Sequence, residues 1–232
     1  MQTFFVWFGS KRAQKMGVGS KGALLDVAAR LRLPVPNGGV LLDEFYQLCL
    51  AEGVAQWSQA GLSVQPDELV ELLFTAVRFP RLPGKVAVRG VPAPVFSLDV
   101  DLADGVGLAR VLTAVWQTHP QDSPARRDVI IMQMVAAETG GVAFSTVGEA
   151  DDRVVVTLGE PNSLLVPQLG WGKRPLATLP PPVRRLQQLL RGVRRALGPG
   201  SWEIAWLDDG RDCWLVQVME DGTRTNADER GD

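Results

Sequence analysis

The sequence predicts an α+β protein whose two lobes lie on either side of a cleft. Helix and strand patterns alternate through the N-terminal half, whereas the C-terminal half is rich in strand patterns and adds one long amphipathic helix. The length of 232 residues suffices for one large domain or two small lobes around a shared core. We expect the first lobe over about 1–130, the second over about 131–219, and a disordered polar tail over 220–232.

The N-terminal half begins with residues 3–8, which are rich in aromatic and β-branched side chains and predict a buried strand. A polar loop over 9–20 precedes a helix over 22–32. This helix must stop before Pro34, because a proline disfavours helical backbone in the residue before it. The further elements expected in this half are a strand over 40–42, a helix capped by Asp43, a helix from Pro66 to Val77, strands over 85–91 and 95–102, and a helix over 105–117.

The C-terminal half predicts five strands around one long helix. The strand patterns cover 128–135, 141–146, 153–158, 202–207 and 213–218. The helix begins after Pro180–Pro182, ends at Gly198–Gly200, and combines a core-facing apolar stripe with a solvated basic face. The arginines of that face are Arg184, Arg185, Arg191, Arg194 and Arg195. An RNA-binding interpretation of these arginines is weaker, because no aromatic residues interleave with them.

Composition excludes several classes of function. The 24 basic and 26 acidic residues give a net charge of −2, which leaves no overall electrostatic footprint for nucleic acid or an anionic membrane. Cys49 and Cys213 have no metal-ligand spacing, and the single histidine, His119, excludes a His-rich metal centre. The N-terminus lacks a secretory pattern, and no apolar run approaches the roughly 20 residues of a spanning helix. We therefore expect a cytoplasmic protein that binds neither nucleic acid nor a membrane.

Two basic residues are candidates for binding an anion. Lys21 lies in Gly17–Gly22, which matches GxGxxG but follows a basic loop and not a strand, and which does not fit a P-loop. Backbone N–H groups, the helix dipole and an ammonium converge at such a helix start and favour phosphate. The alternative is a flexible loop with a solvated lysine. Arg89 lies in an apolar strand, where it either faces solvent or is directed at an anion.

Seven blocks of sequence occur in the order in which one protein family has similar blocks. They are Gly19–Leu25 (compare GGKGANL), Leu33–Leu41 (GLPVPPGFV), Val86–Arg89 (VAVRSSA), Ile131–Ser145 (VQxMVxAExSGVAFT), Leu158–Glu160 (GLGE), Trp202–Trp206 (DIEWA) and Trp214–Gln217 (LLQxR). The chain therefore resembles a shortened and divergent form of the N-terminal ATP-binding domain, also called the PEP/pyruvate-binding domain, of phosphoenolpyruvate synthase, pyruvate phosphate dikinase and rifampin phosphotransferase. The blocks run across nearly the whole chain.

The resemblance implies an ATP-grasp-like fold, with a single domain over 1–219 that holds ATP between two α+β lobes. It also implies a set of site residues, in which Lys21 and Arg89 are the catalytic cations on the ATP phosphates, Gln133, Met134 and Val135 lie at the adenine, and Gln217 lies beside Mg²⁺. The implied activity is that of an ATP-dependent phosphotransferase. It would pass a phosphoryl group to a histidine on a separate partner that carries a phosphohistidine domain.

Departures from the family's pattern favour an alternative, a catalytically inactive relative that acts as a binding or interaction module. A glycine-containing phosphate loop after Arg89 is replaced by Gly90–Pro94, and the arginine of LLQxR is Met219. The glutamate of DIEWA aligns with Ala205 or Ile204. Glu203 is adjacent, but we expect it on the opposite face, because a shift of one residue in a strand reverses the side-chain direction. The family's phosphohistidine and substrate domains are not among these residues.

Overall fold

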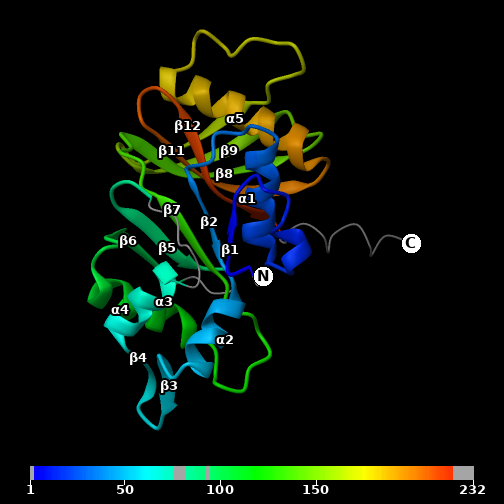
Figure 1. Cartoon of the computed structure of the whole chain (residues 1–232). Coiled ribbons are helices and arrows are strands. Elements are labelled where there is room, and N and C mark those ends of the chain that lie inside the picture. The colour runs from blue at the N-terminus through cyan, green and yellow to red at the C-terminus, as the bar shows by residue number, and fades with distance from the viewer. Residues whose placement is uncertain (1–2, 76–81, 92–94, 222–232) are drawn as a thin grey trace. The chain divides into compact units, whose positions relative to one another are not determined.

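The computed structural model describes residues 3–75, 82–91 and 95–221, and the chain divides into two compact units (Figure 1). The first unit consists of Met1–Asp26 and Asn37–Met134, and the second of Val27–Pro36 and Val135–Asp232. The segment Val27–Pro36 thus belongs to the second unit despite its early place in the chain. The Leu215 amide donates a hydrogen bond of 2.7 Å to the Pro34 carbonyl and ties this segment to the C-terminal strand. Nothing in the sequence pattern indicates this assignment.

The first unit is built on a five-stranded antiparallel sheet with the strand order β1-β2-β7-β5-β6. Its strands are β1 (Phe5–Trp7), β2 (Gly38–Leu41), β5 (Val86–Gly90), β6 (Phe96–Val100) and β7 (Val129–Gln133), and a separate hairpin joins β3 (Ala55–Ser58) to β4 (Gly61–Val64). Its helices are η1 (Gln14–Met16), α1 (Ser20–Arg30, which continues into the second unit), α2 (Asp43–Ala51), α3 (Pro66–Thr75) and α4 (Gly105–Trp116). One face of the sheet shares a hydrophobic core with α2, α3 and α4.

An ionic cluster fixes the start of α2 and corrects the expected role of Asp43. Asp43 is the first residue of the helix and not its cap, since Leu42 occupies the cap position without a side-chain hydrogen bond. The carboxylate of Asp128 accepts from the Asp43 amide at 2.9 Å, so a residue distant in sequence satisfies the helix end. Arg126 bridges Asp128 and Glu44 at 2.9 and 2.8 Å. Burial raises the pKa of Glu44, but the hydrogen bond and charge of Arg126 together with a backbone hydrogen bond outweigh burial, so that the pKa is lowered.

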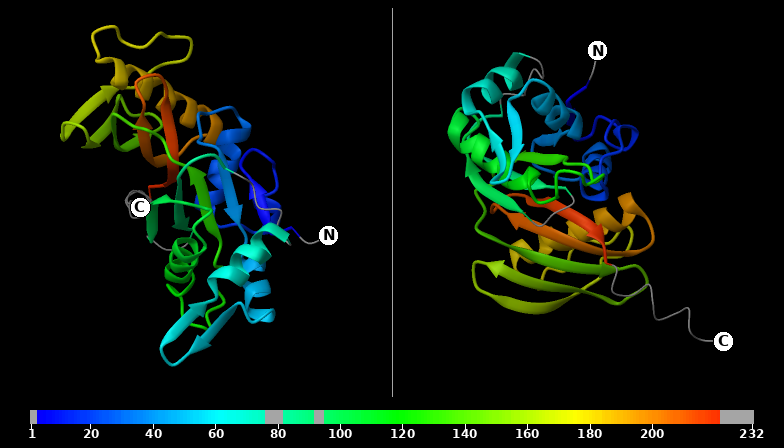
Figure 2. Two further views of the ribbon diagram at one scale, coloured as in Figure 1. Left: turned by 60° about the vertical axis from the view of Figure 1, so that its left-hand side comes forward. Right: turned by 90° about the horizontal axis from the view of Figure 1, so that it is seen from below.

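The second unit is an antiparallel sheet covered on one face by a long helix (Figure 2). The strand order is β10-β9-β8-β11-β12. The elements are β8 (Thr139–Thr146), β9 (Asp151–Leu158), β10 (Asn162–Pro167), α5 (Pro181–Leu197), β11 (Ser201–Asp208) and β12 (Cys213–Glu220). The apolar stripe of α5 is buried, as are Val154, Ile204 and Val218 on the sheet, which confirms the core-facing side predicted from the helical spacing.

The sequence analysis expected all five arginines of α5 on a solvated face, but two of them are ion-paired with buried carboxylates. Arg185 donates to Asp208 at 2.6 and 2.7 Å, and Arg194 donates to Asp152 at 2.8 Å. Both carboxylates are fully buried. At about 100° per residue, positions 185 and 194 point to opposite sides of the helix, with the apolar stripe between them. The two ion pairs therefore clamp α5 to the sheet along both edges of its buried face.

The α+β class is confirmed, and the helices and strands expected from the sequence are present, with ends that differ by a few residues. Three strands were not expected. The strands β3 and β4 span four residues each, too few for a clear alternating pattern, and β10 is a six-residue edge strand in which Leu164, Leu165 and Val166 follow one another without alternation. The predicted end of a helix at Val77 lies outside the described residues. The predicted start of the disordered tail at 220 is too early, because β12 continues to Glu220. The rest of that predicted tail, 222–232, lies outside the described residues.

Each unit buries one cysteine, Cys49 in the first and Cys213 in the second. Burial raises the pKa of the Cys49 thiol to about 12 and also raises the pKa of Cys213, so both thiols stay protonated at neutral pH. Among the residues that the structure describes, no helix combines the length and apolar character needed to cross a membrane.

We expect Asp152→Asn to lower the free energy of unfolding by about 3 kcal/mol, because it leaves the Arg194 guanidinium in place without its counter-charge. Urea unfolding at neutral pH measures this. The control is Asp151→Asn, the neighbouring and less buried aspartate, which should change stability by less than about 0.5 kcal/mol. Equal effects of the two substitutions would contradict the clamp.

The turn between β11 and β12 predicts a dependence of stability on pH. The pKa of Asp209 is lowered to about 2 because the Asp212 amide, the Trp214 indole and the Arg211 amide all donate to its carboxylate. A carboxyl group with a lowered folded-state pKa stabilises the protein above about pH 4 and loses that contribution as the pH falls toward 2. We expect Asp209→Asn to be less stable than the natural protein at neutral pH.

This difference in stability should narrow as the pH falls from about 4 to about 2. Chemical unfolding across that range measures it, with Asp212→Asn as the control, since the Asp212 side chain is exposed. A difference that stays constant over the range would refute this role of Asp209.

Candidate functional site

The glycine-rich segment before α1 packs closely against the sheet of the first unit. A Cβ on Gly22 would lie 2.6 Å from the Val18 side chain and 3.1 Å from that of Val40 on β2, and one on Gly19 would lie 2.7 Å from Val91. Gly17 has a φ of 67°, which favours glycine. The glycines therefore serve close packing and a tight turn, whereas Gly19 and Ser20 stay exposed at the helix start and Lys21 is half-buried beside them.

Lys21 and Arg89 belong to the same face of this sheet. Val40 on β2 is paired with Ile130 on β7, which in turn is paired with Arg89 on β5, and side chains at paired positions share a face. Because α1 contacts Val40 through Gly22, the helix that carries Lys21 covers the face to which Arg89 points. Arg89 is half-buried, and burial lowers the pKa of its guanidinium. The first unit thus places both predicted phosphate-binding residues on one side of its sheet.

Asp26 is a buried carboxylate on α1 that the sequence analysis missed. Its side chain is only 4% exposed, and Oδ1 has no hydrogen-bond partner among the residues the structure describes. Asp26 follows Gly22 by four residues, so it lies on the same side of the helix, the side that contacts the sheet. A buried acidic oxygen of this kind destabilises the fold and is characteristic of functional positions. A lone aspartate in an apolar helix gives no motif that could have singled it out.

The predicted adenine-binding segment lies where the chain passes from the first unit to the second, between Met134 and Val135. The Gln133 amide donates to the Asn37 carbonyl at 2.7 Å, and the Met134 amide donates to the Lys85 carbonyl at 3.0 Å. Two of the three backbone donors are therefore used inside the first unit. Val135 is the one whose amide has no acceptor among the described residues, so it is the best placed to donate to a ligand base.

Gln217 lies on the face of the second unit's sheet that points away from α5. It pairs with Ala205, and its side-chain amide donates to the Met219 sulfur at 3.2 Å. Glu203 pairs with Met219, and along β11 the side chains of Ile204 and Trp206 are buried whereas those of Glu203 and Ala205 are half-exposed. Glu203 therefore shares the face of Gln217. Glu203 lies on the face of Ala205 and opposite that of Ile204, so the expectation that it points away from the family's glutamate holds for the alignment with Ile204 and fails for the alignment with Ala205.

The face that carries Glu203 continues into a hollow of about 650 Å³. Glu203 pairs with Phe144, which pairs with Arg153, which pairs with Leu165. The Arg153 guanidinium lies 4.1 Å from the centre of the Phe144 ring. The Arg153 guanidinium and the Phe144 ring therefore lie on the same sheet face as Glu203 and the predicted Mg²⁺-side residue Gln217. The sequence analysis did not single out Arg153.

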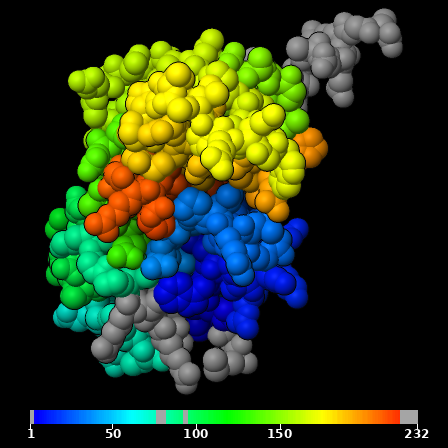
Figure 3. All heavy atoms as spheres, turned by 90° about the horizontal axis from the view of Figure 1, so that it is seen from above, coloured from blue at the N-terminus to red at the C-terminus, as the bar shows by residue number. Residues whose placement is uncertain are grey.

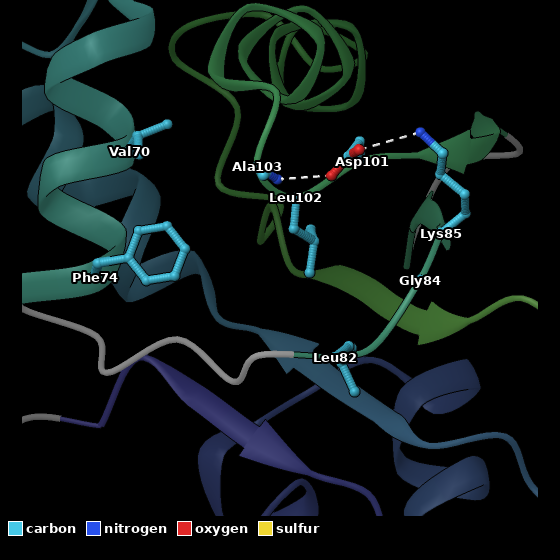
Figure 4. A pocket seen from close by; sticks show the side chains of 8 residues that line it. All are labelled: Val70, Phe74, Leu82, Gly84, Lys85, Asp101, Leu102 and Ala103. Atoms are coloured by element: carbon cyan, nitrogen blue, oxygen red, sulfur yellow. Dashed lines mark hydrogen bonds and ion pairs between the residues drawn. The ribbon is translucent and has the colours of Figure 1, made fainter.

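The first unit has a separate apolar hollow of about 600 Å³ (Figure 4). Phe74 of α3 points into it toward Leu102, and the Lys85–Asp101 ion pair of 3.2 Å lies at its side. The backbone carbonyl of Lys85 also accepts a hydrogen bond from the Met134 amide, so the hollow adjoins the predicted adenine-binding segment. None of the residues predicted as site residues lines this hollow.

Within the described ranges, no group of three or more His, Cys, Asp or Glu side chains could hold a metal ion by itself. Glu203 and Gln217 are oxygen donors on the half-exposed sheet face that also carries Met219. One carboxylate and one amide fit a Mg²⁺ ion that takes its remaining ligands from nucleotide phosphates and water. They do not form a metal site without such a ligand.

Several solved structures share part of the chain's architecture. A RimK domain protein, an ATP-grasp protein from Sphaerobacter thermophilus, has a TM-score of 0.47 and 15% identity, covering 85% of this chain and 57% of its own. D-alanine–D-alanine ligase from Bacillus anthracis has a TM-score of 0.47 and 9% identity, covering 90% and 62%. Carboxyaminoimidazole ribonucleotide synthase from Aspergillus clavatus, solved with ATP, has a TM-score of 0.44 and 11% identity, covering 84% and 43%.

The chain thus spans less than two thirds of the length of these structures. At these identities and TM-scores, the likeness establishes neither the activity nor the ligand of this chain. No protein-family model and no curated protein matches the sequence.

Proposed function

We propose that this chain is an ATP-grasp-like domain that binds Mg·ATP. The observation that carries the proposal is that Lys21, at the start of α1, and Arg89, on β5, lie on one side of the first unit's sheet. A lysine at the N–H groups of a helix start and an arginine on the same side of the sheet suit the phosphates of a nucleotide. The order of sequence blocks that resembles the PEP synthase, pyruvate phosphate dikinase and rifampin phosphotransferase family supports the same conclusion.

The remaining contacts follow from the chemistry of the other predicted residues. In this proposal Gln133, Met134 and Val135 lie at the adenine, with the Val135 amide as donor. Gln217 and Glu203 would hold Mg²⁺, which would supply neutralisation of the charge that develops during phosphoryl transfer. Lys21 and Arg89 orient the phosphates and bind their charge, and they need no proton transfer to do so.

For activity we propose transfer of a phosphoryl group from ATP to a histidine on a separate partner protein. The bond between the γ-phosphorus and the β–γ bridging oxygen of ATP breaks, a bond from that phosphorus to a ring nitrogen of the histidine forms, and ADP leaves with the bonding electron pair on its terminal oxygen. His119 of this chain is not the acceptor, because it lies in the loop after α4, where its Nε2 is buried.

A second candidate function is that of an inactive binding module, and one contact favours it. The position of the family's second phosphate-binding cation is Met219, whose sulfur accepts the hydrogen bond of Gln217. A thioether supplies no positive charge to a phosphate. This substitution removes a cation at the site and leaves the fold of β12 unchanged.

Calorimetric titration with Mg·ATP tests nucleotide binding. We expect saturable binding that Lys21→Ala weakens about tenfold or more, because a charge-assisted contact to phosphate is lost. Lys15→Ala is the matched control, since Lys15 is an exposed lysine in the 3₁₀ helix just before the glycine-rich segment, and it should bind like the natural protein. The absence of heat at millimolar nucleotide would refute the proposal.

Exchange of label between ADP and ATP, measured with a separate phosphohistidine-domain protein present as the acceptor, distinguishes the two functions. Activity that Lys21→Ala abolishes would establish phosphotransfer and exclude the inactive module. Nucleotide binding without exchange, together with no gain from Met219→Arg, would favour the module. We expect Met219→Arg to tighten Mg·ATP binding, because it restores a cation beside Gln217.

A further inference from the structure

The outer side of α5 carries three arginines and a glutamine in one row. At about 100° per residue, positions 184, 188, 191 and 195 lie within a narrow sector directly opposite the buried apolar stripe. From position 184 to position 195 the row is about 16 Å long, which is the length of about five residues of extended peptide. Figure 3 looks onto this face of the second unit, where the atoms of α5 and of the preceding loop lie together in yellow and gold.

The loop over 168–180 is held in place on α5. The buried side chain of Gln187 uses both ends of its amide, because Nε2 donates to the Pro167 carbonyl at 2.7 Å and Oε1 accepts from the Leu176 amide at 3.1 Å. Arg191 donates to the Lys173 carbonyl at 2.8 Å. The loop is therefore a built feature of the surface, and it presents Trp171 in a defined position.

Trp171 is 75% exposed although it is among the largest apolar side chains of the unit. The Arg195 guanidinium lies 4.9 Å from its ring centre. Trp171, Lys173, Arg191 and Arg195 line a hollow of about 400 Å³, and Arg174 and Arg184 line a second hollow of about 440 Å³. Gln188 lines both hollows, so they adjoin along the row on α5.

The charge of this region is one-sided. Residues 161–202 contain seven basic residues and no acidic residue. Arg185 and Arg194 are neutralised by buried aspartates. The α5–loop patch consists of the five remaining cations and the exposed tryptophan: Trp171, Lys173, Arg174, Arg184, Arg191 and Arg195.

We propose that the α5–loop patch docks an extended acidic segment of a partner protein that carries an apolar anchor residue. Glutamate or aspartate side chains of the segment would pair with the cations along the row, and the anchor would pack on Trp171. Tryptophan and arginine are the residue types that contribute most at the centres of protein interfaces. Complementary charge of this kind steers association and fixes the register of the bound segment.

Two other partners fit the patch less well. A single-stranded nucleic acid binds best where successive bases stack on several aromatic side chains, and the patch has one. A membrane surface would require the apolar face of α5, which is buried against the sheet. The docking surface belongs wholly to the second unit and does not depend on nucleotide binding.

Fluorescence anisotropy with a labelled glutamate-rich peptide that has one central phenylalanine tests the proposal. We expect saturable binding that weakens at high salt, that drops about tenfold or more in the double variant Lys173→Glu/Arg174→Glu, and that drops severalfold in Trp171→Ala. These side chains are exposed, so unfolding temperatures should match that of the natural protein. A lysine-for-glutamate version of the peptide should not bind.

The matched control is Arg30→Glu/Arg110→Glu, which makes the same change in net charge at two exposed arginines outside the patch. It should bind the peptide within about twofold of the natural protein. Three outcomes would overturn the proposal: no saturable binding of the peptide, an equal loss in the control variant, or displacement of the peptide by oligouridine at lower concentration than by unlabelled peptide. The last outcome would make the patch a nucleic-acid surface.

Discussion

Two buried carboxylates, Asp152 and Asp208, decide how the second unit is assembled. Neither could remain charged inside the sheet without a partner, and α5 supplies one arginine to each. Because these arginines lie on opposite sides of the apolar stripe, they fix the rotation of the helix about its own axis. The remaining arginines of α5 therefore point away from the sheet, and Gln217 lies on the sheet face opposite to α5.

The local sequence pattern was enough to predict most helices and strands of this fold. The contacts between residues distant in sequence could not be predicted from it. The spacing of Leu186, Leu190 and Val193 predicts both α5 and its buried side, since helical periodicity is a property of neighbouring residues. The partners of Arg185 and Arg194 could not be predicted, because each aspartate lies on a strand distant in sequence. The same holds for the start of α2, where the Asp43 amide donates a hydrogen bond to the carboxylate of Asp128, which is distant in sequence.

The candidate site shows the same division. A resemblance in motif order indicated Lys21 and Arg89, and strand register explains why they share a side of the sheet. The face of Glu203 relative to the family's glutamate could not be predicted, because an alignment uncertain by one residue is equivalent to a reversal of side-chain direction in a strand. Asp26 and Trp171 were not indicated, since the burial of the one and the exposure of the other depend on tertiary packing.

Because each unit contains one buried cysteine, the rate at which that thiol reacts measures how often its unit opens. Cys49 is enclosed by the first unit and Cys213 by the second, and neither thiol can react with an alkylating reagent until its surroundings separate. Labelling followed by mass spectrometry would yield two opening rates from one sample of the natural chain. A ligand that contacts a single unit would slow the labelling of one cysteine and leave the other unchanged, so the natural sequence already contains a probe for where a ligand binds.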